Sequence, residues 1–313
     1  CGWLPIVNTG LRLVIGSWKI MEQHLPRKRQ SLFSFHLVTS SPLYRMLPPV
    51  TLSLSGLSLC IGAALLLASC NDQEVKVNSV NVNVTEALSP ERSDSVRVNV
   101  NAEYPVDGLV DSVKNSVCEI IVEATFGSDY SGLSVEDAAN RWAGDFVAEY
   151  KKANLELLSE AQGDEANDMG AGFFSWENKL EGYFSGRHDN IITYTVSNYV
   201  FEGGAHGSTV ESSVNIDLKT GKQVTEEEFF IPGYKEALSA LLSAHLHDEM
   251  PDQESYDALF IKDLEPNGNF KVSEQGVTYV YGQYEIGPYY LGIIKVTLPW
   301  NELGDLVREH PTK

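Results

Sequence analysis

Positive charge is scarce in this chain. Its 313 residues include 23 lysines and arginines against 43 aspartates and glutamates, a formal net charge of −20. Residues 1–69 contain six of the basic residues and one of the acidic ones, so the rest of the chain has 17 against 42 and a charge of −25. Nucleic acids and anionic lipid surfaces bind basic faces, so neither is an expected partner. The charge is compatible with long-range attraction to a basic partner. The simpler alternative is that the acidic surface only keeps the protein soluble.

Cysteine is scarce as well, with four residues in the whole chain. Cys60 and Cys70 belong to an apolar stretch near the N-terminus, which leaves Cys118 in the part that is expected to fold. One thiol forms no internal disulfide and supplies no cysteine-based zinc site. Cys118 lies on the valine-rich face of a predicted helix, so we interpret it as a buried structural thiol rather than a nucleophile.

The sequence also lacks the motifs of common enzyme classes. We find no Gly-x-Ser-x-Gly elbow, Walker loop, His-Glu-x-x-His motif or EF-hand loop. The pair Glu226 and Glu227 could suggest glycosidase carboxylates, but adjacent acids at a helix start favour an interaction with the helix dipole. His245 and His247 lie two apart on a predicted helix, so they point apart and chelate poorly. The sequence therefore predicts no enzyme, no metal and no cofactor.

An uncharged apolar run covers residues 52–67 and ends at Leu67-Ala68-Ser69-Cys70. It resembles the signal peptide of bacterial lipoproteins, in which a small residue precedes a cysteine that is lipidated and becomes the first residue of the mature protein. The alternatives are a buried helix or a single membrane anchor, but the run is shorter than the ~20 residues of a full span. Because two or three acyl chains hold a protein firmly on a membrane, we expect Cys70 to be a lasting anchor.

This resemblance sets the expected organisation of the N-terminal region. The chain opens with Cys1, while Met21 and Met46 are both plausible starts. We expect a spurious or non-structural extension at 1–45, the signal peptide at 46–69, and the lipid anchor with the first strand at 70–92. The expected location is extracytoplasmic, lipid-anchored to the bacterial cell envelope, with the outer membrane favoured and either a periplasmic or a surface-exposed position.

Hydrophobic periodicity predicts an α+β fold. Strands are expected at 75–84, 96–100, 176–186, 191–201, 209–218, 269–272, 277–281 and 293–298. Helices are expected at 107–126, from Ser134 onward, at 225–230, 234–247 and 300–307, with capping boxes at Ser134 and Thr225. In the second helix a core stripe is predicted from Trp142, Phe146, Tyr150, Ala153 and Leu157. Because strands and helices come in blocks, we predict antiparallel sheets with packed helices, arranged as two consecutive α/β portions at 93–206 and 207–308 in one compact unit.

A glycine-rich turn at residues 201–207 has the sequence Phe-Glu-Gly-Gly-Ala-His-Gly and is called here the Gly–His turn. His206 could act as a general base or a metal ligand beside Glu202, but the sequence supplies no partner residues for either role. The glycines Gly203, Gly204 and Gly207 more simply permit positive φ and close backbone approach. We therefore expect a structural or binding role, with His206 hydrogen-bonded across the turn.

Three segments together resemble the ectodomain family of RsiV, the lysozyme-sensing anti-sigma factor. They are residues 198–207, residues 214–230, and residues 277–289 leading to Pro299. The resemblance is strong over 190–305 and weaker over 75–190, and the same module precedes a peptidoglycan deacetylase domain. A lipoprotein-like signal stands here in place of a sigma-binding segment and a spanning helix. The resemblance implies a stand-alone module that recognises something in the envelope, with the Gly–His turn at the join of its two portions.

The residues between the last two predicted strands, 282–292, are called here the tyrosine loop, because the span exceeds what a hairpin needs. Its candidate binding residues are Tyr284, Glu285, Pro288, Tyr289 and Tyr290. Two hypotheses compete: a basic protein such as a lysozyme-type muramidase, bound as receptor, decoy or inhibitor, or a peptidoglycan fragment stacked on aromatic faces that also include Trp176 and Tyr183. Sheet packing is the simpler role for these aromatics, and a structural lipoprotein without a soluble ligand is a third alternative.

Overall fold

The computed structural model of the protein describes residues 74–160 and 172–309. The predictions for Cys70 and for the signal peptide fall outside these ranges, as does most of the predicted loop at 160–172. Within the described ranges, no helix combines the length and the apolar character that crossing a membrane requires.

The larger of two sheets has six strands in the order β1 to β6. The strands are β1 (Lys76–Ala87), β2 (Ser95–Asp107), β3 (Trp176–His188), β4 (Ile191–Phe201), β5 (Ser208–Asp217) and β6 (Lys222–Val224). All neighbours are antiparallel except β2 and β3, which are parallel. A parallel pair needs a crossover connection, and two helices, α2 (Asp111–Phe126) and α3 (Val135–Glu160), supply it.

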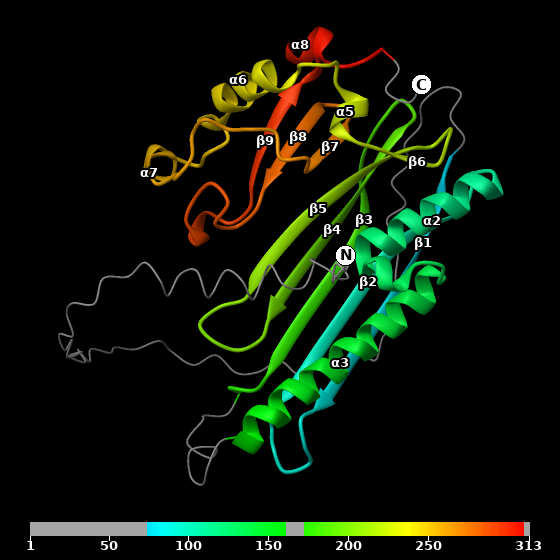
Figure 1. Ribbon diagram of the computed structural model, residues 1–313, viewed down its shortest axis with the longest axis vertical. Coiled ribbons are helices and arrows are strands. Elements are labelled where there is room, and N and C mark those ends of the chain that lie inside the picture. Colours follow the sequence, from blue (N-terminus) through cyan, green and yellow to red (C-terminus); the bar gives the residue numbers. More distant parts are fainter. Residues whose placement is uncertain (1–73, 161–171, 310–313) are drawn as a thin grey trace, which may run out of the picture. The chain divides into compact units, whose positions relative to one another are not determined.

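Helices α2 and α3 lie across one face of the sheet, over β1 to β3 (Figure 1). The period of two along β2 puts Val96, Val98 and Val100 on that face, where they are buried. They meet Val117 and Ile121, which lie one helical turn apart on α2 and are fully buried. Burying one such side chain contributes roughly 1.5–3 kcal/mol to the free energy of unfolding. The alternation of apolar residues in β2 and their helical spacing in α2 therefore specify how this helix packs on the sheet.

The predicted core stripe of α3 is correct at its beginning and wrong at its end. Trp142 stacks on Phe146 with ring centroids 5.6 Å apart, and Tyr150 is fully buried. Leu157 instead has 52% of its surface exposed, while Asn154 is buried and donates to the Tyr150 carbonyl at 2.9 Å. Leu157 lies on the same helix face two turns beyond Tyr150, where no described residue covers it.

The smaller sheet contains β7 (Phe270–Ser273), β8 (Gly276–Tyr281) and β9 (Ile294–Pro299), all antiparallel. Its accompanying helices are α5 (Glu226–Phe229), α6 (Lys235–Leu246), α7 (Gln253–Asp257) and α8 (Trp300–Leu303). A second apolar core forms between this sheet and α6, whose Leu238, Leu242 and Leu246 are fully buried at helical spacing. The short elements β6 and α7 have no counterpart among the predicted elements.

The two sheets meet where β7 lies against β3, β4 and β5. There the Thr193 hydroxyl donates to Asn215 Oδ1 at 2.6 Å and accepts from the Val272 N–H at 2.9 Å. The prediction of an α+β fold with antiparallel sheets and packed helices in one compact unit is confirmed. The sequence boundary at 206/207 falls between the paired strands β4 and β5, so the large sheet continues past it to Val224.

Candidate functional site: the Gly–His turn and the tyrosine loop

The Gly–His turn depends on its glycines in two different ways. Gly203 and Gly204 have φ values of 90° and 91°, a region that side chains with a Cβ adopt only with strain. Gly207 is needed for space, because a Cβ there would lie 2.5 Å from the ring of Tyr199. These features bring the backbone of the turn close to β4 and direct His206 outward.

His206 stacks on Tyr289 of the tyrosine loop, with ring centroids 3.9 Å apart and an interplanar angle of 25°. Its Nδ1 lies 3.1 Å from the Gly207 carbonyl oxygen, so Nδ1 carries the proton and donates to that acceptor. The same carbonyl accepts from the Tyr289 hydroxyl at 2.7 Å. Two segments predicted separately are thus joined into one site, while the hydrogen bond of His206 reaches only the next residue, Gly207, and does not cross the turn.

The tyrosine loop has internal structure of its own. The Glu285 carboxylate accepts from the Gly282 N–H at 2.6 Å and from Asn267 Nδ2 at 2.8 Å. Ile286 is buried among the residues of the second core, and a 3-10 turn (Tyr289–Leu291) follows Pro288. Tyr284 has a φ of 65°, which is uncommon outside glycine and is often found at functional sites. The loop is therefore held in a defined conformation.

Apolar side chains remain exposed around this anchored loop. Tyr284 and Tyr290 have 55% and 68% of their surface exposed. Phe260 and Ile261, which the sequence reasoning missed, are also exposed, and their N–H groups donate to the Ile286 carbonyl at 2.8 and 3.2 Å. The signal that could have found them is an adjacent aromatic and aliphatic pair outside any predicted element. Exposed apolar groups gathered at one place are typical of interaction surfaces.

The surroundings of this surface are acidic. Three acidic residues close to Phe260 in the sequence are exposed, namely Asp257, Asp263 and Glu265. Lys262 Nζ lies 3.8 Å from the Asp257 carboxylate and forms an ion pair with it. Glu202 of the Gly–His turn keeps an exposed surface, while desolvation by its neighbours and the nearby Glu149 charge raise its pKa. Exposed acidic residues in the segment that contains Phe260 and Ile261 favour a partner that carries basic groups.

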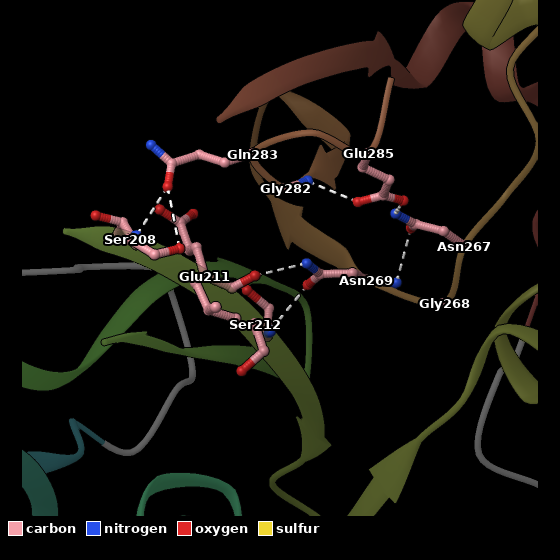
Figure 2. A pocket seen from close by; sticks show the side chains of 12 residues that line it. Ser208, Glu211, Ser212, Asn267, Gly268, Asn269, Gly282, Gln283 and Glu285 are labelled. Carbon is pink, nitrogen blue, oxygen red and sulfur yellow. Dashed lines mark hydrogen bonds between the residues drawn. The ribbon is translucent and has the colours of Figure 1, made fainter. Parts of the chain in front are cut away.

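A groove of about 540 Å³ lies beside the tyrosine loop (Figure 2). One wall is formed by residues 208–213 of β5, and the other by residues 267–269 and by Gly282, Gln283 and Glu285. Gln283 bridges the two walls, since its Oε1 accepts from the Thr209 N–H at 2.9 Å.

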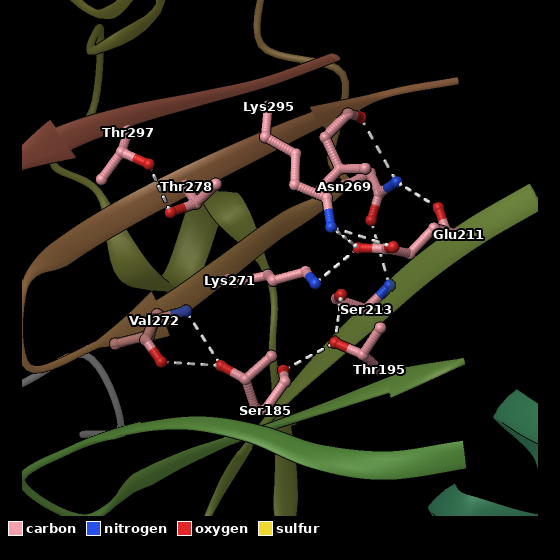
Figure 3. Close-up of polar contacts among 12 residues, drawn as sticks. Ser185, Thr195, Glu211, Ser213, Asn269, Lys271, Val272, Thr278, Lys295 and Thr297 are labelled. Atoms are coloured by element: carbon pink, nitrogen blue, oxygen red, sulfur yellow. Dashed lines mark hydrogen bonds and ion pairs between the residues drawn. The ribbon is translucent and has the colours of Figure 1, made fainter. Parts of the chain in front are cut away.

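Three charged side chains hold β5 against the smaller sheet (Figure 3). The Glu211 carboxylate lies 2.5 Å from Lys271 Nζ and 2.9 Å from Lys295 Nζ. Burial alone would raise the pKa of Glu211, but the hydrogen bonds and charges of the two lysines outweigh burial and lower it. For Lys271 the balance is reversed. Burial lowers its pKa, and the neighbouring Glu211 carboxylate only partly offsets that effect. The ion-pair cluster gives the groove a rigid wall.

Glu226 and Glu227 lie in the first turn of α5, as predicted, but Glu226 has a further role. Glu226 is buried and accepts hydrogen bonds, each of 2.8 Å, from the hydroxyls of Tyr234 and Tyr279 and from the Gly268 N–H. Burial and this carboxylate raise the pKa values of both tyrosines. Glu227 is exposed. The two adjacent acids therefore have different roles. Glu226 connects the start of α5 to Tyr234, to Tyr279 of β8 and to the backbone of Gly268.

The remaining aromatic and histidine candidates lie away from this surface. Trp176 is partly buried and packs against the first core, with its ring centroid 5.6 Å from that of Tyr150, and Tyr183 is partly buried on β3. His245 Nε2 lies 2.7 Å from a Glu302 oxygen, as expected for a satisfied boundary residue. Within residues 74–160 and 172–309 no group of three His, Cys, Asp or Glu side chains is arranged to hold a metal ion. Cys118 is half-buried and packs against the first core.

Comparisons with known proteins find similarity in sequence over part of the chain and in fold over more of it. Residues 227–301, which include the tyrosine loop, match the family described as "Protein of unknown function (DUF3298)". No curated protein matches the chain. A crystal structure of a DUF3298 family member from Bacteroides fragilis has a TM-score of 0.68 at 24% identity, over 77% of this chain and 96% of that one.

A second crystal structure, of a DUF3298 family protein from Pseudomonas aeruginosa, has a TM-score of 0.55 at 18% identity, over 77% of this chain and 97% of that one. Identities this low show a shared fold. The chain is therefore similar to DUF3298 proteins in sequence over residues 227–301 and in fold over about three quarters of its length.

Proposed function

We propose that the chain is a lipid-anchored, non-catalytic binding protein of the bacterial envelope, and that the Gly–His turn and the tyrosine loop form its recognition surface. The observation that carries this proposal is the stacking of His206 on Tyr289 together with the hydrogen bond from Tyr289 to Gly207. These contacts hold two distant segments together while Tyr284 and Tyr290 remain exposed. A rigid support with exposed aromatic tips suits binding, because little side-chain freedom is lost when a partner docks.

The partner that we propose is a basic, lysozyme-like muramidase, bound as receptor, decoy or inhibitor. Three observations support it: the resemblance to the RsiV ectodomain, the charge of −25 after residue 69, and the exposed tyrosines beside Phe260 and Ile261. Tyrosine and phenylalanine are enriched in protein interfaces, and acidic rim residues increase the association rate of a basic partner.

A cell-wall glycan, or a role as accessory to a peptidoglycan-modifying enzyme, is the second candidate. It is favoured by the exposed face of Tyr284 at the edge of a groove whose walls carry the amides of Asn267, Asn269 and Gln283. Aromatic faces and planar polar groups are suited to sugar rings and their hydroxyls. A glycan carries little charge, so its binding should depend only weakly on salt.

Calorimetric titration of the full chain in mild detergent with a basic lysozyme, at low and at moderate salt, tests the first candidate. We expect saturable binding that weakens as salt rises, since surface charges are screened over about 10 Å at 0.1 M ionic strength, together with reduced muramidase activity. Tyr290→Ala should weaken binding at least tenfold, whereas Val110→Ala, a comparably exposed residue at the start of α2, should not. Absence of heat at both salt concentrations would reject this lysozyme and favour glycan fragments.

The anchor is tested separately through Cys70. Cys70→Ser removes the thiol that the lipid would occupy, so the protein should move from the membrane fraction to the soluble fraction and lose incorporation of labelled palmitate. Cys60→Ser lies within the same apolar run and should leave both properties unchanged. Membrane retention of the Cys70→Ser protein would contradict lipid anchoring.

A further inference from the structure

The outer edge of β5 carries backbone groups that its neighbour leaves unpaired. β6 pairs only with Asn215, Ile216 and Asp217, whereas β5 begins seven residues earlier, at Ser208. Backbone groups in a strand point alternately to either side. The N–H and C=O groups of Thr209, Glu211 and Ser213 therefore point away from β4 and into the groove, as the bonds from Thr209 N and Ser213 N to side chains across the groove confirm.

Side-chain amides occupy part of this edge in the manner of a neighbouring strand. Asn269 Oδ1 accepts from the Ser213 N–H at 3.0 Å, and Asn269 Nδ2 donates to the Glu211 carbonyl at 2.7 Å (Figure 3). A carboxamide has the same donor and acceptor as a peptide group, so Asn269 takes the place of one residue of an added strand. Among the described residues, the Glu211 N–H, which lies along the edge between the Thr209 carbonyl and the Glu211 carbonyl, has no hydrogen-bond partner.

The groove has the dimensions of an extended peptide. Six consecutive residues of β5, 208–213, form one wall, which corresponds to roughly 20 Å of strand at 3.3 Å per residue. Its volume of about 540 Å³ falls within the usual size of binding clefts. The wall does not need to move, because Glu211 is fixed by Lys271 and Lys295.

We propose that this groove binds an extended peptide segment of a partner protein by adding it as a strand to the edge of β5. On binding, the Asn269 amide releases the Ser213 N–H and the Glu211 carbonyl. The C=O and N–H groups of the incoming peptide then bond to these two groups in its place. The net charge of −25 after residue 69 favours a segment with basic side chains. The groove shares Gly282, Gln283 and Glu285 with the tyrosine loop but is not lined by Tyr290, so the inference does not depend on a muramidase being the partner. The alternative is that the amides only protect an edge strand from aggregation.

Backbone N-methylation gives a direct test. The probe is an acetylated, amidated seven-residue peptide of alternating lysine and valine, titrated into the full chain in mild detergent and followed by fluorescence anisotropy. Two further versions are N-methylated at alternate residues, one series on each edge of the peptide. Strand addition uses one edge only, so one methylated version should lose at least tenfold in affinity and the other should stay within threefold. Equal affinities of the methylated versions, or no binding of any probe, would overturn the proposal.

Variants of the groove provide an independent readout. Asn269→Ala frees the Glu211 carbonyl and the Ser213 N–H, and Gln283→Ala frees the Thr209 N–H, so each should raise the affinity for the probe threefold or more. Asn140→Ala is the matched control, because Asn140 donates to the Glu136 carbonyl within α3 and does not line the groove. Thermal melting verifies that each variant is folded. Unchanged or weaker probe binding in both edge variants would contradict strand addition.

Two controls distinguish peptide binding in the groove from glycan binding and from the proposed binding of a muramidase. A chitotetraose competitor that displaces the probe from the wild type would identify the groove as an N-acetyl sugar site and overturn the peptide proposal. Tyr290→Ala should leave probe binding unchanged, because Tyr290 does not line the groove. Probe binding without lysozyme binding would reject only the proposed muramidase function.

Discussion

His206 and Tyr289 form a stacked pair whose two members hydrogen-bond to the same carbonyl oxygen, that of Gly207. The carbonyl is available because Gly207 lies against the ring of Tyr199, where no side chain would fit. One glycine therefore determines how the Gly–His turn meets the tyrosine loop. The consequence is a single surface built from β4, β5 and the loop between β8 and β9.

Tyr289→Phe removes only the hydroxyl that donates to Gly207, so we expect a loss of about 1 kcal/mol in the free energy of unfolding. Tyr289→Ala also removes the stacking with His206 and should release the loop, which reduces partner binding at least tenfold. Urea unfolding and calorimetric titration measure the two effects. Tyr290→Phe is the control, since the exposed Tyr290 makes no hydrogen bond to the described residues. Full binding by Tyr289→Ala would show that the stacking does not hold the surface.

Glu226→Ala should be strongly destabilising, because it leaves the buried hydroxyls of Tyr234 and Tyr279 without their acceptor. We expect roughly 3 kcal/mol, the range for hydrogen bonds to a buried charged group. Glu227→Ala, the adjacent and exposed acid, should change the unfolding free energy by less than about 0.5 kcal/mol. Both values come from the midpoint and slope of urea unfolding. Equal effects of the two substitutions would contradict the assignment of Glu226 as a buried acceptor.

Glu211 should make the fold sensitive to acid. Lys271 and Lys295 hold its folded-state pKa below the ordinary value of 4.5. The stabilisation is therefore complete above pH 4.5 and is lost as the pH falls through the folded-state pKa. Glu211→Gln should cost about 3 kcal/mol at pH 7, since two lysines lose their counter-charge, and should flatten the decline in melting temperature below pH 4.5.

The control for this pH dependence is Glu86→Gln. Glu86 pairs with Lys151 at 2.6 Å on the surface, where both side chains are substantially exposed. Exposed pairs contribute little, so the melting curve of this variant should follow the wild type at each pH. A wild-type decline that persists unchanged in Glu211→Gln would assign the acid sensitivity to other carboxylates.

Cys118 should react slowly with a thiol reagent such as dithiobis(nitrobenzoate). Burial raises the pKa of Cys118 above its ordinary value, an effect that the nearby Lys114 only partly offsets. Fewer thiolates are then present at neutral pH, and the thiolate is the reactive form. We expect a reaction that is at least tenfold faster in denaturing urea than under native conditions. Immediate labelling of the native protein would contradict a structural role for this thiol.

Local patterns predicted most individual elements, because alternation and helical period are properties of short segments. The strands at 191–201 and 277–281 and the helix ending at 126 agree with the structure to within a residue at those ends. The capping box at Thr225 is present, with reciprocal bonds to Glu228. At Ser134 half of the predicted box is present, because the hydroxyl accepts from the Asp137 N–H at 3.0 Å while the Asp137 carboxylate accepts from that hydroxyl. By contrast, β6 and α7 have three and five residues, which is too short for a period to be recognised.

The sequence by itself determined the class of the fold, the acidic character of the protein, and the residue types in the Gly–His turn and the tyrosine loop. These properties depend on composition and on neighbours along the chain. Only the tertiary structure decided that β2 and β3 are parallel, that Glu226 is buried while Glu227 is exposed, and that His206 lies on Tyr289. Each of these contacts joins segments that are distant in the chain, and no local pattern encodes which distant segments meet.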